Sequence, residues 1–142
     1  MDKVFPDKWI RKAIFGRLNN LDVNGELIKC YDTRLTSPDI ADNYIIMSTQ
    51  TATVDKNNKC EWFWNSSILL DVFTSYSRSG NPGSRLGVDD IMNLVRQETN
   101  DLVLEGGLSI ITQTQSFPND ITAVTDNEVV QRKFLRLELL IK

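Results

Sequence analysis

The chain has 142 residues, of which 41% are hydrophobic and 25% are charged, and its formal net charge is −3. This length and apolar content predict one folded domain over residues 1–142 and exclude a predominantly disordered chain. The negative charge argues against a nonspecific nucleic-acid binder, and the absence of histidine excludes histidine-dependent catalytic triads and imidazole-ligated zinc sites.

The first predicted element is an amphipathic helix in residues 7–21, DKWIRKAIFGRLNNL. Pro6 suits its first turn, and the polar segment NNLDVNG supplies a stop. Five apolar residues recur at helical spacing and predict the side that packs on a core: Ile10, Ala13, Ile14, Leu18 and Leu21. Four basic residues occupy much of the other side: Lys8, Arg11, Lys12 and Arg17. A basic side is most often a solvated face, and the alternative is contact with an acidic subunit or with DNA.

Three strands are predicted next. Residues 26–32 and 43–51 have the short, β-rich patterns of strands, and a proline-bearing segment separates them. The polar DKNNK at 55–59 has the character of a hairpin tip before a third strand at 60–76. Alternate residues of this strand share an apolar face: Trp62, Trp64, Ile68, Leu70 and Val72. This register favours a core position for both tryptophans over a partner-facing hot spot.

The segment SRSGNPGSRLGVDD, residues 77–90, leads from this strand to a second helix. A glycine-rich loop before a helix can bind phosphate, but a Walker loop needs Lys and Ser or Thr directly after its second glycine. The segment lacks that arrangement, so a surface connection is the favoured interpretation. Anion binding through Ser84 and Arg85, or contact with a partner protein, is the alternative.

The second predicted helix begins at Val88 and ends at the EGG segment, residues 105–107. Asp89 and Asp90 are then expected in its first turn, where the helix dipole favours carboxylates. Its apolar stripe comprises Ile91, Leu94, Val95 and Leu102.

Two closing strands complete the predicted fold. Residues 108–117 alternate in polarity, residues 118–128 form a polar connection, and the final strand at 129–142 has an apolar face of Leu135, Leu137, Leu139 and Ile141. The order α-β-β-β-α-β-β predicts an α+β fold, with a mainly antiparallel sheet and two helices packed on one face. The other face is expected to be partly covered or wet.

Other chemistry is sparse. Cys30 and Cys60 match no four-ligand zinc spacing and are expected to be small core or near-core residues, and a disulfide between them stays open. The sequence contains no calcium loop, so neither a metal nor a cofactor is expected. No run approaches the roughly 18 apolar residues of a membrane span, and the protein is expected to be cytosolic when it is synthesised.

Four segments together form a recognisable pattern: the helix KWIRKAIFGRL, the strand IKCYDTRL with its connection to NYIIMS, the strand ILLDVFTSYS, and the helix VDDIMNLVRQET before two closing strands. In these segments, which span nearly the whole chain, the protein resembles the bacteriophage tail terminator or tail completion family. The stretch LLDVFTSYSRSG before a helix is the most telling piece. The chain departs from the family pattern in its polar TDNE connection and in the length of the loop at 76–87.

The resemblance implies a structural virion protein without catalytic activity. Its copies would form a ring, a hexamer, that caps the finished tail tube and joins it to the head during virion assembly. Its partners would be other copies of itself, the tail tube protein and neck or connector proteins, with no membrane involved. DNA would pass through the lumen without specific binding, and assembly would take place in the cytoplasm of the bacterial host.

Two loops are the candidate contact regions, because subunits of such a ring would meet through sheet edges and loops. Their candidate residues are Arg78, Asn81, Ser84 and Arg85 in the glycine-rich loop, and Lys56, Asn57 and Lys59 at the hairpin tip.

Three alternatives stay open. Within the same biology, the chain could be a head-completion or connector ring protein of the neck. A small hydrolase that uses acidic residues, or a nucleotide-binding enzyme, is a distant alternative from another class. A general oligomeric scaffold is the third.

Overall fold

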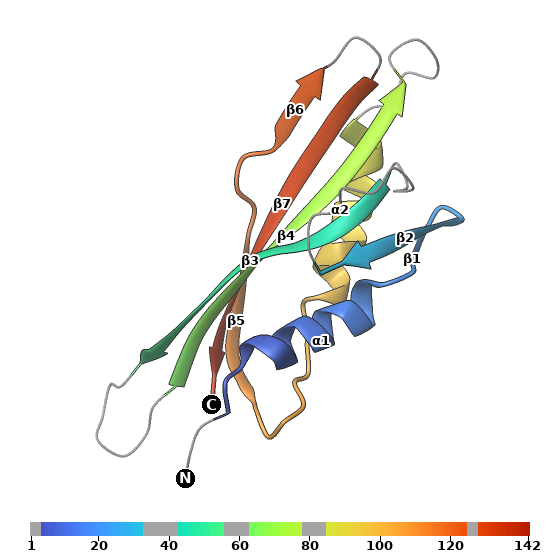
Figure 1. Ribbon diagram of the computed structural model, residues 1–142. Helices are drawn as coiled ribbons and strands as arrows, with labels where there is room; N and C mark the ends of the chain where they lie inside the picture. Colours follow the sequence, from blue (N-terminus) through green and yellow to red (C-terminus); the bar gives the residue numbers. More distant parts are fainter. Residues whose placement is uncertain (1–3, 33–42, 56–62, 78–84, 125–127) are drawn as a thin grey trace.

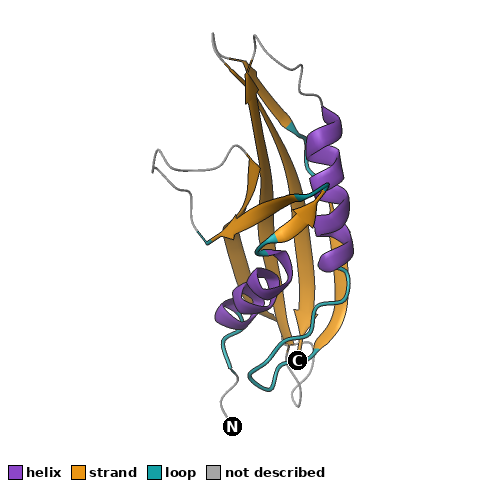
Figure 2. Cartoon of the chain, turned by 90° about the vertical axis from the view of Figure 1, so that its right-hand side faces the viewer, coloured by secondary structure: helices purple, strands orange, loops and turns teal. Residues whose placement is uncertain are grey.

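The computed structural model describes residues 4–32, 43–55, 63–77, 85–124 and 128–142. In them, two helices lie on one face of a twisted seven-stranded sheet (Figures 1 and 2). The elements in chain order are α1 (Asp7–Leu18), β1 (Leu21–Val23), β2 (Glu26–Tyr31), β3 (Asn43–Asp55), β4 (Phe63–Ser77), α2 (Arg85–Glu98), β5 (Ile110–Ser116), β6 (Ile121–Val124) and β7 (Glu128–Ile141). The predicted α+β class is confirmed.

The strands lie in the order β1-β2-β3-β4-β7-β5, and β6 pairs with a second part of the β7 edge that β5 leaves free. β4 and β7 pair along nearly their whole length and form the centre of the sheet. Among the described strands, only β2 and β3 run parallel, over three residue pairs, and every other pair is antiparallel. The sheet is therefore mainly antiparallel, as predicted.

The face of the sheet beneath the helices, called the covered face below, carries the core. Its central residues are fully or almost fully buried: Ile68, Leu70 and Val72 of β4, and Leu135, Leu137, Leu139 and Ile141 of β7. The helices contribute Ile10, Ile14 and Leu18 from α1 and Val88, Ile91, Met92 and Val95 from α2. These apolar stripes follow the predicted periodicities, because period 2 places alternate strand residues, and period 3.6 one helix side, on the same surface.

Two short strands lie in segments that were predicted to be connections. β1 occupies part of the expected helix stop, and β6 occupies part of the expected polar link before β7. β1 turns into β2 through Asn24 and Gly25, which both have positive φ, of 54° and 89°. Asn-Gly is the preferred pair for this two-residue hairpin turn. Neither strand has the length that makes polarity alternation visible in a sequence.

The boundaries of α2 differ from the prediction. The helix begins at Arg85 and ends at Glu98, so Asp89 and Asp90 lie in the second turn instead of the first. Gly87, which suggested a loop, lies inside the helix, where a glycine is tolerated at a cost of about 1 kcal/mol. Leu102 is buried, but it lies beyond the helix end.

Candidate interaction surface

The predicted contact residues lie almost entirely outside the described residues. Arg78, Asn81 and Ser84, together with Lys56, Asn57 and Lys59, belong to segments that the structure leaves undescribed, as do Trp62 and Cys60. Arg85 begins α2, and its side chain is not described. The two segments join opposite ends of β4, a strand of 15 residues that spans about 45 Å at about 3.3 Å per residue. The described chain therefore attaches the two predicted contact regions far apart.

No helix lies over the opposite face of the sheet, called the open face below, in the part of the chain that is described (Figure 2). In the half of this face where β3, β4, β7 and β5 lie side by side, hydroxyl and amide groups dominate. The residues are Thr51, Thr53, Asn65, Ser67, Thr112, Thr114 and Glu138, and they line a hollow of about 340 Å³. Thr51 and Ser67 share a hydrogen bond of 2.6 Å between their hydroxyl oxygens. This threonine surface presents polar groups that carry little charge.

The periodicity of the sequence carries a signal for the threonine surface. Threonines at alternate positions, 51 and 53 on β3 and 112 and 114 on β5, point to the same side of their strands. The register aligns the two strands across the sheet, because Thr51 is opposite Ser67, Ser67 is opposite Glu138, and Glu138 is opposite Thr114. Only the pairing of distant strands shows that these residues form one surface.

The other half of the open face holds a buried ion pair. The Asp71 side chain is 4% exposed, and Arg132 Nη2 donates to its Oδ2 at 2.5 Å, while Arg132 Nε donates to the same oxygen at 3.2 Å. The Arg132 guanidinium also lies 5.2 Å from the centre of the Phe134 ring. A carboxylate so far removed from water needs this partner, because an isolated buried charge is strongly unfavourable.

Aromatic rings lie on the same half of the open face as this ion pair. The Tyr44 ring stacks on Phe73 at 4.6 Å between centroids and meets Tyr31 edge-on at 5.9 Å. Tyr44 is 8% exposed and Ile46 is 5% exposed, although neither belongs to the core beneath the helices. The mixed face that the β4 sequence predicted thus separates into an aromatic half and a threonine half.

The basic side of α1 is solvated in part, as the sequence favoured, because Lys8 and Lys12 are exposed, whereas Arg11 is engaged within the chain. Arg11, 29% exposed, donates from Nε to Gln50 Oε1 at 2.6 Å, from Nη2 to the Ser48 carbonyl oxygen at 3.0 Å, and from Nη1 to the Asp32 carboxylate. The Met47 carbonyl oxygen accepts a further, longer bond of 3.4 Å from Nη1. Arg11 therefore satisfies carbonyl groups of β3 where β2 no longer pairs with it.

Two of the remaining basic residues of α1, Lys12 and Arg17, face the segment after α2. Arg17 Nη1 donates to Asp101 Oδ1 at 3.0 Å, and Lys12 Nζ lies 2.7 Å from Glu105 Oε2. Lys8 Nζ lies over the Trp9 ring, 4.9 Å from its centre. The sequence reading missed these contacts because their partners are more than 80 residues away along the chain.

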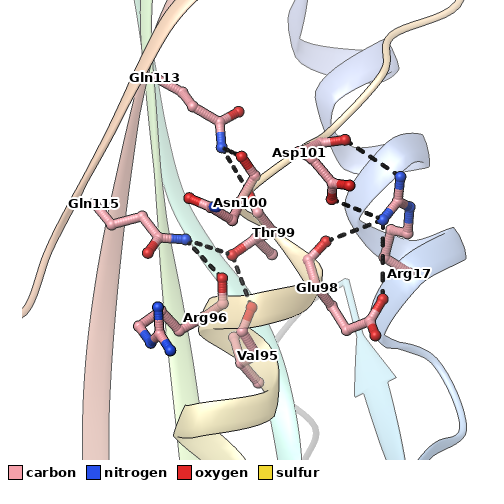
Figure 3. A network of polar contacts seen from close by, with 9 residues as sticks. All are labelled: Arg17, Val95, Arg96, Glu98, Thr99, Asn100, Asp101, Gln113 and Gln115. Atoms are coloured by element: carbon pink, nitrogen blue, oxygen red, sulfur yellow. Dashed lines mark hydrogen bonds and ion pairs between the residues drawn. The ribbon is translucent and has the colours of Figure 1, made fainter.

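The C-terminal end of α2 is tied to β5 by two glutamines (Figure 3). Gln113 Nε2 donates to the carbonyl oxygens of Thr99 and Asn100, and Gln115 Nε2 donates to the Arg96 carbonyl oxygen at 2.9 Å. Carbonyl groups in the last turn of a helix have no partner within the helix. The edge strand β5 supplies their donors, so strand and helix fix each other.

Groups suited to catalysis are sparse in the described residues. Burial raises the pKa of the Cys30 thiol to about 12, with the nearby Asp32 charge as the smaller cause, so this thiol is a poor nucleophile. The described residues contain no group of three or more Cys, Asp or Glu side chains placed to hold a metal ion. None of the described helices has the length and apolar content needed to cross a membrane. Trp64 packs against the core as predicted.

Comparison with solved structures shows a likeness of fold. No protein-family model matches the sequence, and no curated protein matches it. Among solved structures, the fold is similar to that of a chain in the virion of a native gene transfer agent (GTA) particle, with a TM-score of 0.62 and 13% sequence identity. The likeness covers 97% of this chain and 99% of that chain, so the whole architecture is shared.

Proposed function

We propose that this protein is a structural component of a phage-like virion, a tail terminator whose copies form a hexameric ring. The ring caps the tail tube and joins it to the neck. The observation that carries this proposal is the full-length fold likeness to a chain of a gene transfer agent virion, since 97% of one chain and 99% of the other correspond. A fold supports many functions, but a match without added or missing domains favours a comparable structural use.

The surfaces of the chain support a noncatalytic role. The open face offers hydroxyl and amide groups with Glu138 as the charge among the residues that line its hollow. The formal net charge of the chain is −3. A ring built from such subunits would let DNA pass without specific binding, because phosphate adhesion depends on Lys and Arg. The same role places the protein in the virion after its assembly in the bacterial cytoplasm.

The tail tube protein and the neck proteins are the proposed partners, beside other copies of this chain. We assign their contacts to the two segments at opposite ends of β4. Arg78, Asn81 and Ser84 belong to one segment, and Arg85 begins α2 directly after it. Lys56, Asn57 and Lys59 would serve in the other segment. Two contact regions attached to opposite ends of a long strand suit a ring that touches one partner below and another above.

Electron microscopy of the purified protein, alone and mixed with tail tubes, tests the proposal. We expect rings, and rings attached to one end of the tubes. Attachment to portal complexes instead of tubes would identify a head-completion or connector protein. The fold likeness supports that alternative equally well. Monomers with no affinity for tubes or portals would overturn both assignments.

A pair of variants tests the assigned loop. Arg78→Ala with Arg85→Ala should reduce the fraction of tube ends that carry a ring. Arg96→Ala is the matched control, because Arg96 is an exposed arginine near the other end of α2. Equal occupancy of tube ends by both variants and the unmodified protein would remove Arg78 and Arg85 from the contact.

A further inference from the structure

The four-stranded half of the sheet, β3-β4-β7-β5, has a strand edge without a described partner on each side. β2 pairs with β3 only at Tyr44, Ile45 and Ile46, so no described strand lies beside residues 51–55 of β3. On the other side, β5 pairs with β7 alone. Each edge exposes a row of backbone N–H and C=O groups, to which another strand can add.

Both edges lack the features that usually prevent such pairing. Proteins protect edge strands with charged side chains, proline or extreme shortness. Residues 51–54 are Thr-Ala-Thr-Val, and β5 is Ile-Ile-Thr-Gln-Thr-Gln-Ser, so neither stretch contains a charge or a proline. Asp55, at the end of β3, is the one charged residue of the two edges. Val54 and Ile111, which are 42% and 49% exposed, add apolar surface to the two edges. Covering the two edges would remove their apolar surface from water and give their free backbone groups hydrogen-bond partners.

The two edges are also held in place by the rest of the fold. Arg11 of α1 binds Gln50 and the Ser48 carbonyl oxygen just before the unpaired part of β3. Gln113 and Gln115 bind the end of α2 from β5. Edges that are already ordered lose little conformational entropy when a partner strand binds, which favours association.

Strand direction and register make the two edges fit each other. β3, β4, β7 and β5 alternate in direction, because each neighbouring pair is antiparallel. If a second copy with the same orientation lies beside the first, its β3 runs antiparallel to β5 of the first copy. Thr51 and Thr114 lie in the same row of residues across the four strands. In the joined sheet, Thr51 of the second copy therefore lies beside Thr114 of the first copy without a shift along the strands.

We propose that residues 51–55 of β3 in one copy pair antiparallel with β5 (Ile110–Ser116) of a second copy. The contact joins two different edges, so each bound copy leaves one edge free for the next, and the chain of copies closes when their rotation allows it. The threonine surface then continues from copy to copy on one side of the joined sheet. This inference rests on the proposed ring and specifies its subunit interface.

Variants of the full chain that each add one exposed cysteine, on a Cys60→Ser background that keeps the buried Cys30, test the pairing. Thr53→Cys protein is mixed with protein carrying cysteine at position 112, 114 or 116, under mild oxidation. We expect disulfide-linked dimers in the mixture for at least one of the three positions, because paired edge residues bring their Cβ atoms within disulfide range. Each variant alone should stay uncrosslinked.

A matched control and two contrary outcomes define the test. Ser67→Cys lies on the same face as Thr53 but on the inner strand β4, opposite Thr51, so its mixture with the β5 variants should not crosslink. Crosslinking of Thr53→Cys protein with itself would show a symmetric β3–β3 contact and overturn the proposal. Oligomers in sedimentation without a crosslink at any of the three positions would overturn it as well.

A charge variant separates this inference from the proposed function. Thr53→Lys should convert oligomers to monomers in analytical ultracentrifugation, whereas Val103→Lys, at a position 76% exposed and away from both edges, should not. Rings on tube ends that survive Thr53→Lys would disprove the edge pairing and leave the tail terminator assignment intact. Crosslinks between the two edges in a protein that does not bind tail tubes would support the edge pairing and contradict the tail terminator assignment.

Discussion

The two faces of the central sheet are built from alternate residues of the same strands, yet they have opposite character. On β4, Leu70 is fully buried beneath the helices, while its neighbour Leu69 points to the open face and keeps part of its surface exposed. On β5, Gln113 is bound to α2, while its neighbour Thr114 belongs to the threonine surface. The covered face holds the fold together, and the threonine half of the open face is available for contact.

This division explains how one sheet can serve both stability and assembly. The free energy of folding comes mainly from apolar area removed from water, and here most of that area lies on the covered face. The threonine half of the open face contributes little burial, so its residues can be chosen for their surface properties. Variants at adjacent residues of one strand therefore compare the covered face with the open face directly.

The largest expected difference between the faces is in thiol reactivity. On a Cys60→Ser background, Cys30 is the buried thiol of the covered side, and Thr53→Cys adds an exposed one. The pKa of Cys30 is raised from 9.0 to about 12, so at pH 8 its thiolate fraction should be about 1,000-fold lower than that of an ordinary thiol. Alkylation followed by mass spectrometry measures both rates, and equal rates would contradict the assignment.

The same raised pKa has a consequence for stability. The unfolded chain loses the Cys30 proton near pH 9 and the folded chain only near pH 12. The contribution of this group is therefore fully present below pH 9 and decreases as the pH rises towards 12. Urea unfolding of Cys30→Ala and unmodified protein at pH 8 and pH 10 measures it, and an unchanged difference between the two pH values would contradict it.

Core truncation should give the next largest effect. Leu70→Ala removes a fully buried side chain and should lower the free energy of unfolding by about 4 kcal/mol. Leu69→Ala, one residue away on the open face, should lower it by less than about 1.5 kcal/mol, since this side chain is only partly buried. Urea denaturation measures both variants. Equal losses of stability in the two variants would mean that Leu69 is buried as deeply as Leu70, which would contradict the difference between the faces.

The buried ion pair is the exception on the open face, and it should be the most sensitive point there. Arg132→Ala leaves the Asp71 carboxylate buried without its charged partner and should cost about 3 kcal/mol. Arg136→Ala, four residues further along the same face of β7, should cost about 0.5 kcal/mol or less. A double variant that also carries Asp71→Ala should be less destabilised than the sum of the two single variants.

The glutamine contacts to α2 should give the smallest measurable effect. Gln113→Ala removes donors from the Thr99 and Asn100 carbonyl oxygens and should cost about 1 kcal/mol. Thr114→Ala, its neighbour on the threonine surface, should change stability by about 0.5 kcal/mol or less. Thermal unfolding compares the two, and a larger loss for Thr114→Ala would contradict the division between the faces.

Several features of the fold followed from local sequence pattern. The apolar positions of α1, such as Ile10 and Ile14, and those of β7, such as Leu135 and Leu137, were correctly predicted, because burial repeats every 3.6 or every 2 residues. The α+β class followed from the order of these patterns. The short strands β1 and β6 did not, since three or four residues cannot show a period.

The candidate surface depended on contacts between distant parts of the chain. The sequence showed that Arg11 lies on a basic helix side, but only the fold places it against Gln50 and the β3 backbone, and the same is true of Asp71 and Arg132. Threonines at 51 and 114 are ordinary alternating residues until strand pairing aligns them in one row.

Sequence periodicity fixes which side of its own element a residue occupies. Which elements become neighbours, which edges stay open and which charges pair are decided by tertiary packing, because those interactions join residues that no local pattern relates.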